Sequence, residues 1–202
     1  MAISFSKMLE HSHRRLNDEA ISEFRSLVKT SIGKWVTSVD REWKSLSPDG
    51  FLNENDMEGY KSVLDDQYYL AQQVQQLSDE LSITALYKLV EIHTKKVVSW
   101  HLPSIPPKKL SNIGGLTKSL SFELSEVKEF SAFDELRELN NAIKHQGMVT
   151  DNLEKKYHNH GWVTGTELKA LDKAYDRLAP LISIYMDDLA SKIYSSSERN
   201  DT

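Results

Sequence analysis

The residues of this sequence that could do chemistry together lie between Glu135 and Gly147, a stretch predicted to be one helix. Successive residues of an α-helix turn by about 100°, so five polar side chains fall on one arc. They are Arg137, Asn140, Asn141, Lys144 and His145. A guanidinium binds phosphate oxygens through two parallel donors, and an imidazole exchanges protons near neutral pH. The grouping therefore predicts a site that binds a phosphate and could supply acid–base chemistry.

The two other arcs of this predicted helix determine how it would pack. One arc is apolar, must be buried, and holds Phe133, Leu136, Leu139 and Ile143. The other is expected to face solvent and holds Glu135, Glu138, Ala142 and Gln146. Ser131 is the expected N-cap, and Asp134 can pair with Arg137 one turn later. The positive side chains therefore lie at the margin of the buried face, where a second surface could cover them.

Ordinary helix chemistry explains part of the polar arc without any functional site. Lys144 and His145 fall in the last turn, where the helix dipole favours positive charge. Gly147 is placed to end the helix. Asn140 and Asn141 are poor residues for a helix interior, and this structural interpretation explains them least well.

Two histidine pairs elsewhere have a spacing that metal ligands can use. His11 and His13 are separated by one residue, and so are His158 and His160. Further ligands are missing at a recognisable spacing, and the chain contains no Cys. The sequence therefore predicts neither a metal site nor a cofactor.

The composition is that of an ordinary globular protein. The chain has 202 residues, enough to bury a substantial core, and 39% of them are hydrophobic. It has no continuous apolar stretch of the length that a signal peptide or membrane span needs, so we expect a cytoplasmic protein. A net charge of −5 argues against strong non-specific nucleic-acid binding. Residues 88–109 nevertheless carry five Lys against one Glu.

The elements that would position the polar arc are nearly all helical. Apolar residues at steps of three and four predict a long helix from Asn17 to Leu46, ended by a turn at residues 47–50. A second helical region covers about residues 56–100, as one bent helix or two. Its expected buried stripe is Leu70, Val74, Leu77, Leu81, Ala85, Leu89, Val97 and Trp100. Residues 1–16 are expected to form a short helix or a loosely docked arm.

Two loops flank the helix that carries the polar arc. Residues 102–121 are rich in Pro, Gly and Ser and are predicted to be irregular. Residues 148–163 are expected to be a loop with a possible short β-hairpin. A capping box at residues 164–167 would start the last helix, which Pro180 should kink or restart. With a frayed tail from 195, the fold expected for residues 1–202 is one all-α domain, an up-down bundle of four to five long helices.

The segment LRELNNAIKH, Leu136 to His145, resembles the signature helix of the HEPN superfamily. These are small all-α proteins, and many are RNases of bacterial defence or toxin–antitoxin systems. Their motif is an Arg, then four to six residues, then a His, with a polar residue often following the Arg. Here seven residues separate Arg137 from His145, and Glu138 follows the Arg.

The resemblance implies metal-independent cleavage of RNA. The ribose 2′-OH attacks the adjacent phosphodiester and leaves a 2′,3′-cyclic phosphate and a 5′-OH. His145 would be the general acid and base, and Arg137 would stabilise the phosphate. Asn140, Asn141 and Lys144 would support phosphate binding. In the family two copies of this helix meet in a dimer, so the resemblance also implies a homodimer, together with an antitoxin or a defence-system partner.

Two other interpretations stay open. One is a non-catalytic helical binding module, such as an inactive HEPN protein or a subunit of a defence complex, that holds RNA, a nucleotide or a protein partner through the same face. The other is a helical protein with a purely structural role. The sequence does not distinguish these from the RNase.

Overall fold

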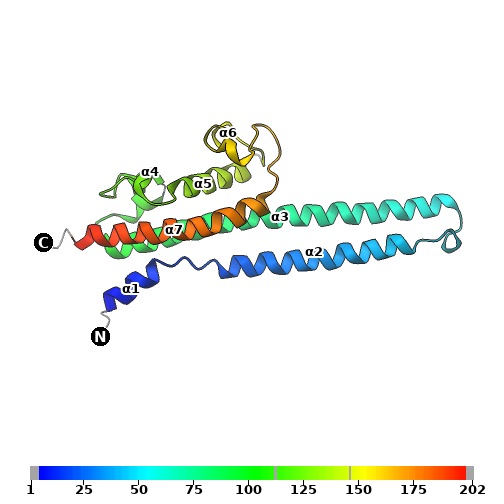
Figure 1. Ribbon diagram of the computed structural model, residues 1–202, viewed down its shortest axis with the longest axis horizontal. Coiled ribbons are helices and arrows are strands. Elements are labelled where there is room, and N and C mark those ends of the chain that lie inside the picture. Colours follow the sequence, from blue (N-terminus) through cyan, green and yellow to red (C-terminus); the bar gives the residue numbers. More distant parts are fainter. Residues whose placement is uncertain (1–4, 112, 146, 199–202) are drawn as a thin grey trace. The chain divides into compact units, whose positions relative to one another are not determined.

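The computed structural model describes residues 5–111, 113–145 and 147–198, and within these ranges the fold is all-α, as predicted (Figure 1). Seven α-helices and several 3₁₀ turns account for the regular structure there, with no β-strand. The contacts group the chain into two compact units. One unit is Glu19–Ser82, and the other combines Met1–Asp18 with Ile83–Thr202.

The unit Glu19–Ser82 is an antiparallel helical hairpin made of α2 (Glu19–Ser45) and the first part of α3 (Glu54–His101) (Figure 1). The turn between them contains a 3₁₀ helix at Pro48–Gly50, in the place the sequence predicted. The two helices are joined by a hydrogen bond of 3.2 Å from Trp35 Nε1 to Gln67 Oε1, and Tyr68 donates to Asp40. The hairpin thus combines a narrow apolar seam with polar contacts along its edges.

Helix α3 is one continuous helix, which answers the question of one helix or two. Its buried stripe was predicted only in part, because Leu70, Leu77, Leu81, Ala85 and Trp100 are exposed. The buried line instead runs through Leu64, Ala71, Ser78, Ser82, Ile83, Leu86, Val90, Thr94, Val97 and Val98. The small and hydroxyl residues in this line, such as Ala71, Ser78 and Ser82, allow close approach of a neighbouring helix. A stripe predicted from large apolar residues does not include them.

The second unit is built around α5 (Phe130–His145) and α7 (Leu171–Glu198), which pack against each other beside the last part of α3. Phe133 of α5 stacks on Tyr185 of α7, with ring centroids 4.6 Å apart and planes 5° apart. Helix α1 (Phe5–His13) is the short helix, one of the two alternatives predicted for residues 1–16, and it contacts α7. His13 lies 3.1 Å from the Tyr194 hydroxyl, and Arg14 lies 2.7 Å from Asp187.

The two predicted loops contain more helix than expected. Residues 102–121 hold a 3₁₀ turn at Pro107–Ser111 and the five-residue helix α4 (Ile113–Thr117), although no long helix crosses the two prolines. The possible β-hairpin is absent from the described part of residues 148–163. A short helix, α6 (Asp151–Tyr157), and a 3₁₀ turn at His158–His160 occupy this segment. The Thr150 side chain accepts the Leu153 N–H and so caps α6.

The start of the last helix was also placed wrongly. Residues 164–167 form a turn with Gly165 at φ 77°, and the only bridge found among the described residues pairs Glu167 with Met148. Helix α7 begins at Leu171, continues through Pro180 without restarting, and reaches Glu198. The tail is therefore helical beyond residue 195, and residues 199–202 lie outside the described ranges. None of the described helices is long and apolar enough to cross a bilayer.

Candidate functional site

Helix α5 has the predicted position but a different start. It begins at Phe130, so Ser131 lies inside the first turn and is not its N-cap. The Ser131 carbonyl instead accepts the Tyr157 hydroxyl at 3.1 Å. At the other end Gly147 has φ 65° and its N–H donates to the Ala142 carbonyl, which confirms the predicted terminating glycine.

The arc of α5 that was expected to face solvent is buried. Glu135, Glu138 and Ala142 all lie in the interior, and Gln146 lies outside the described residues. Helix α6 packs on α5, and the segment that follows α6 supplies further contacts to the same arc. Two acids that looked like surface residues are therefore the centres of two polar networks.

Glu135 is the centre of the first network and is only 1% exposed. The two terminal nitrogens of Arg177 donate to its carboxylate at 2.8 and 2.7 Å. Trp162 Nε1 also donates to it at 2.9 Å, and His160 Nδ1 lies 2.9 Å away. Burial raises the pKa of Glu135, but the hydrogen bonds from Arg177 and Trp162 outweigh this and hold the pKa below its usual value. This cluster fixes the segment after α6 against α5 and α7.

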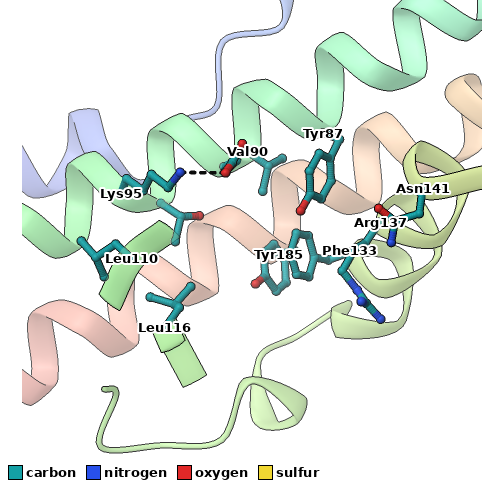
Figure 2. A pocket seen from close by; sticks show the side chains of 11 residues that line it. Tyr87, Val90, Lys95, Leu110, Leu116, Phe133, Arg137, Asn141 and Tyr185 are labelled. Atoms are coloured by element: carbon teal, nitrogen blue, oxygen red, sulfur yellow. Dashed lines mark hydrogen bonds and ion pairs between the residues drawn. The ribbon is translucent and has the colours of Figure 1, made fainter. Parts of the chain in front are cut away.

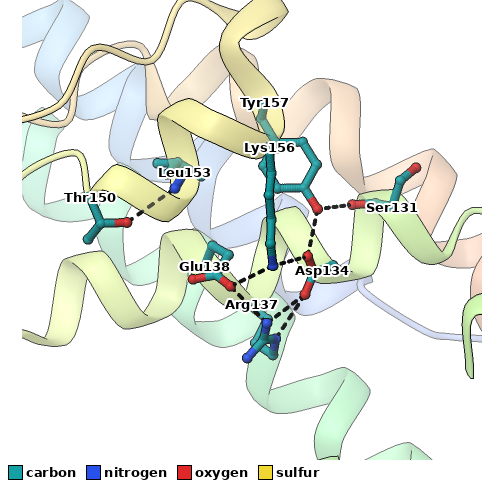
Figure 3. A network of polar contacts seen from close by, with 8 residues as sticks. All are labelled: Ser131, Asp134, Arg137, Glu138, Thr150, Leu153, Lys156 and Tyr157. Atoms are coloured by element: carbon teal, nitrogen blue, oxygen red, sulfur yellow. Dashed lines mark hydrogen bonds and ion pairs between the residues drawn. The ribbon is translucent and has the colours of Figure 1, made fainter.

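The second network surrounds Arg137, the predicted phosphate ligand (Figure 3). Its Nη2 lies 2.6 Å from Asp134 and 2.8 Å from Glu138, so the predicted pairing with Asp134 is confirmed. Lys156 of α6 binds the same two carboxylates at 2.8 and 3.2 Å. The Tyr157 hydroxyl lies 2.9 Å from Asp134.

The charges in this second network balance, because two carboxylates face two cations. Burial raises the pKa of Asp134, but hydrogen bonds from Lys156 and Arg137 more than offset this and lower it. Asp134 therefore stays ionised next to Arg137 at neutral pH. The guanidinium is a partner in an internal ion-pair network, and its positive charge is largely compensated.

The other four predicted residues have different surroundings, and of these only Asn141 lines the same cavity as Arg137. Asn140 is 1% exposed, and its Oδ1 has no hydrogen-bond partner among the described residues. Asn141 is half-buried and lines a cavity together with Arg137. Lys144 and His145 are exposed in the last turn of α5, with the Lys144 ammonium 5.9 Å from the centre of the Tyr87 ring. Eight positions along a helix correspond to about 12 Å, so Arg137 and His145 are well separated along α5.

The cavity lies between α3, α5 and α7 and was not predicted (Figure 2). Its volume is about 220 Å³. The side chains that line it are Tyr87, Val90, Glu91, Thr94, Lys95, Leu110, Leu116, Phe133, Arg137, Asn141 and Tyr185. Of its three aromatic residues, Phe133 was predicted to be buried. The sequence did contain one signal for a polar cavity. Tyr87 and Tyr185 are tyrosines, whose hydroxyls need a hydrogen-bond partner when they are buried.

Within the described ranges, no group of three or more His, Asp or Glu side chains could hold a metal ion. His13 and His160, one from each predicted pair, lie against Tyr194 and Glu135.

The spacing of the resembled motif can be compared with these positions. The position separated from His145 by four residues is Asn140, and those separated by five and six are Leu139 and Glu138. An Arg is therefore missing throughout the family's usual spacing, and Asn140 at the nearest position is buried and uncharged. No model of a known protein family, no curated protein and no solved structure matches the chain. The HEPN relationship accordingly stays a prediction.

Proposed function

We propose that the protein is a non-catalytic helical binding module that holds RNA by its phosphates at the C-terminal end of α5. The observation that carries this proposal is the ion-pair network of Arg137. Asp134 and Glu138 already occupy its guanidinium at 2.6 and 2.8 Å. A phosphate in a cleavage transition state would have to compete with two carboxylates for that charge, so the usual source of transition-state stabilisation is weak here.

The end of α5 offers groups suited to binding phosphate. Lys144 and His145 are exposed, and His145 has no hydrogen bond or ion pair within the described part of the chain. The Asn141 amide is likewise without a hydrogen-bond partner there. Lysine and amide side chains commonly bind nucleic-acid phosphates and carry little sequence information. The expected mode is therefore weak, salt-sensitive binding of single-stranded RNA.

A second candidate is the metal-independent endoribonuclease implied by the HEPN resemblance. The observation in its favour is the open position of His145, whose imidazole is free to reach a substrate. In this candidate a second copy of the chain would bring its own Arg137 and His145, and RNA would displace the carboxylates from one guanidinium. The two candidates predict the same RNA contacts and differ in whether the RNA is cut.

Binding and cleavage can be measured on the same sample. A 5′-fluorescein single-stranded RNA is titrated with the full chain, its anisotropy is recorded, and the RNA is then run on a denaturing gel. We expect the RNA to bind in a salt-dependent way and to stay intact on the gel. We expect the affinity to be several-fold lower in Lys144→Ser and in His145→Ala. Each lost phosphate contact should lower the salt slope by about 1. The matched control is Lys128→Ser, an exposed lysine just before the opposite end of α5, which should bind like the wild type.

Binding that is equal in all three variants would overturn the assignment to the end of α5. Fragments ending in 2′,3′-cyclic phosphate that disappear with His145→Ala, and persist in EDTA, would instead establish the RNase.

A further inference from the structure

We infer that the cavity between α3, α5 and α7 binds an uncharged planar aromatic molecule of one or two rings that carries hydrogen-bonding groups on its edge. The inference does not require RNA binding by the end of α5, although Asn141 belongs to both proposed sites. It rests on the size of the cavity, the aromatic residues in its walls, the polar groups that line it, and the pairing of the charged side chains at its border.

The size selects small molecules. An enclosed apolar cavity of about 150 Å³ is sufficient for benzene, and pockets for drug-sized ligands begin near 300 Å³. The volume here is about 220 Å³, between these two values. The volume matches a molecule of one or two fused rings.

The walls favour a flat molecule. The Phe133 ring is stacked on Tyr185 (Figure 2). The Tyr87 ring is nearly parallel to Phe133, with the ring centroids 6.4 Å apart and the planes 12° apart. The aliphatic part of the lining is Val90, Leu110 and Leu116, and apart from the aromatic rings the rest is polar or charged. These rings contact one another and leave no slot between them. Aromatic rings interact well in offset or edge contacts, so a planar guest in the cavity can pack against the side of this stack.

Three polar groups in the lining have no hydrogen-bond partner among the described residues: the hydroxyls of Tyr87 and Tyr185 and the amide of Asn141. Tyr185 is the most buried of these three residues and is only 1% exposed. Burial raises the pKa of Tyr185, which keeps the hydroxyl a neutral donor at physiological pH. A ligand with an acceptor on its edge would satisfy it, and Asn141 offers both a donor and an acceptor.

The charged side chains at the border of the cavity are already paired with other side chains. Glu91 pairs with Lys95 at 2.7 Å and with Lys88 at 3.1 Å. Arg137 pairs with Asp134 and Glu138. Each of these charges already has a partner. A charged ligand would lose its hydration and would have to compete with that partner, so an uncharged ring is preferred.

Such a ring could come from a free metabolite or from a base of single-stranded RNA. The fluorescent base 2-aminopurine distinguishes these sources, because stacking on aromatic rings quenches its emission. The full chain is titrated into free 2-aminopurine in one arm and into a short RNA that contains 2-aminopurine in the other. Saturable quenching of the free base, displaced by indole and not by benzoate or cyclohexanol, is the expected result. Quenching in the RNA arm alone would support the same ring site with RNA as its source.

Two variants test the cavity itself. Tyr185→Phe removes one hydrogen bond and should weaken quenching by about 2- to 10-fold. Leu116→Phe should fill the space and abolish quenching. The matched control is Tyr194→Phe on the same helix, whose hydroxyl contacts His13 outside the cavity and whose loss should leave quenching unchanged. Circular dichroism checks that each variant is folded, and Tyr185→Phe is decisive if Leu116→Phe does not fold.

Absence of saturable quenching in both arms would overturn the inference. So would equal affinity of Tyr185→Phe and wild type, or displacement by cyclohexanol as effective as by indole. If the wild-type chain does not bind RNA but still quenches the free base, the proposed function is refuted and the inference of a ring-binding cavity stands.

Discussion

Replacing Arg177 by Met should destabilise the protein strongly, because it leaves the carboxylate of Glu135 buried without its main cation. Glu135 is 1% exposed and receives two of its hydrogen bonds from Arg177. Removing one partner of a buried pair costs about 3–5 kcal/mol. For a chain of this size each kcal/mol shifts Tm by about 2–4 °C, so the drop should be on the order of 10 °C.

The assay is urea unfolding followed by tryptophan fluorescence, at pH 7 and at pH 4. In the wild type the lowered pKa of Glu135 stabilises the fold above the usual glutamate pKa, and this stabilisation is lost as pH falls through the folded-state pKa. In Arg177→Met the buried carboxylate is disfavoured, so its protonation relieves the defect and the gap to wild type should narrow at pH 4. The double variant Glu135→Gln/Arg177→Met should recover part of the loss. A cost below about 1 kcal/mol at pH 7, or a gap that does not change with pH, would refute this reasoning.

Two further predictions concern other parts of the same unit. Tyr157→Phe removes the hydroxyl that contacts Asp134 and the Ser131 carbonyl, and it should lower the free energy of unfolding by about 1 kcal/mol in urea titrations, whereas an unchanged midpoint would contradict the contact. Burial lowers the pKa of His13 and of His101, so the folded state favours their neutral forms; the docking of α1 should weaken as pH falls below the usual histidine pKa of about 6.5. Hydrogen exchange of residues 5–13, corrected for intrinsic rates, should then be faster at pH 5 than at pH 7.5, and equal protection would contradict it.

The long helices could be predicted because their signals are local. Apolar residues at helical steps located α2 and α5, and the Pro-Asp-Gly turn marked the end of the hairpin's first helix. Gly147 ends α5 by adopting a positive φ, which its lack of a side chain permits. The pairing of Asp134 with Arg137 also followed from their spacing of three residues.

The candidate site could be predicted only in part, because distant residues decide what each side chain does. Glu135 looked like a surface acid, and its partner Arg177 is 42 residues away in the sequence. Lys156 neutralises the carboxylates around Arg137 from a helix that the turn-like composition of residues 148–163 concealed. The cavity brings together residues of α3, α5 and α7, and no periodicity within one helix reveals such an arrangement.

The most direct test of the central claim is the fate of RNA incubated with the purified full chain in EDTA and resolved on a denaturing gel, beside His145→Ala. RNA that is bound by the wild type and stays intact is the result expected of a binding module whose Arg137 is held by Asp134 and Glu138. Wild-type cleavage to products ending in 2′,3′-cyclic phosphate, absent with His145→Ala, would contradict that claim.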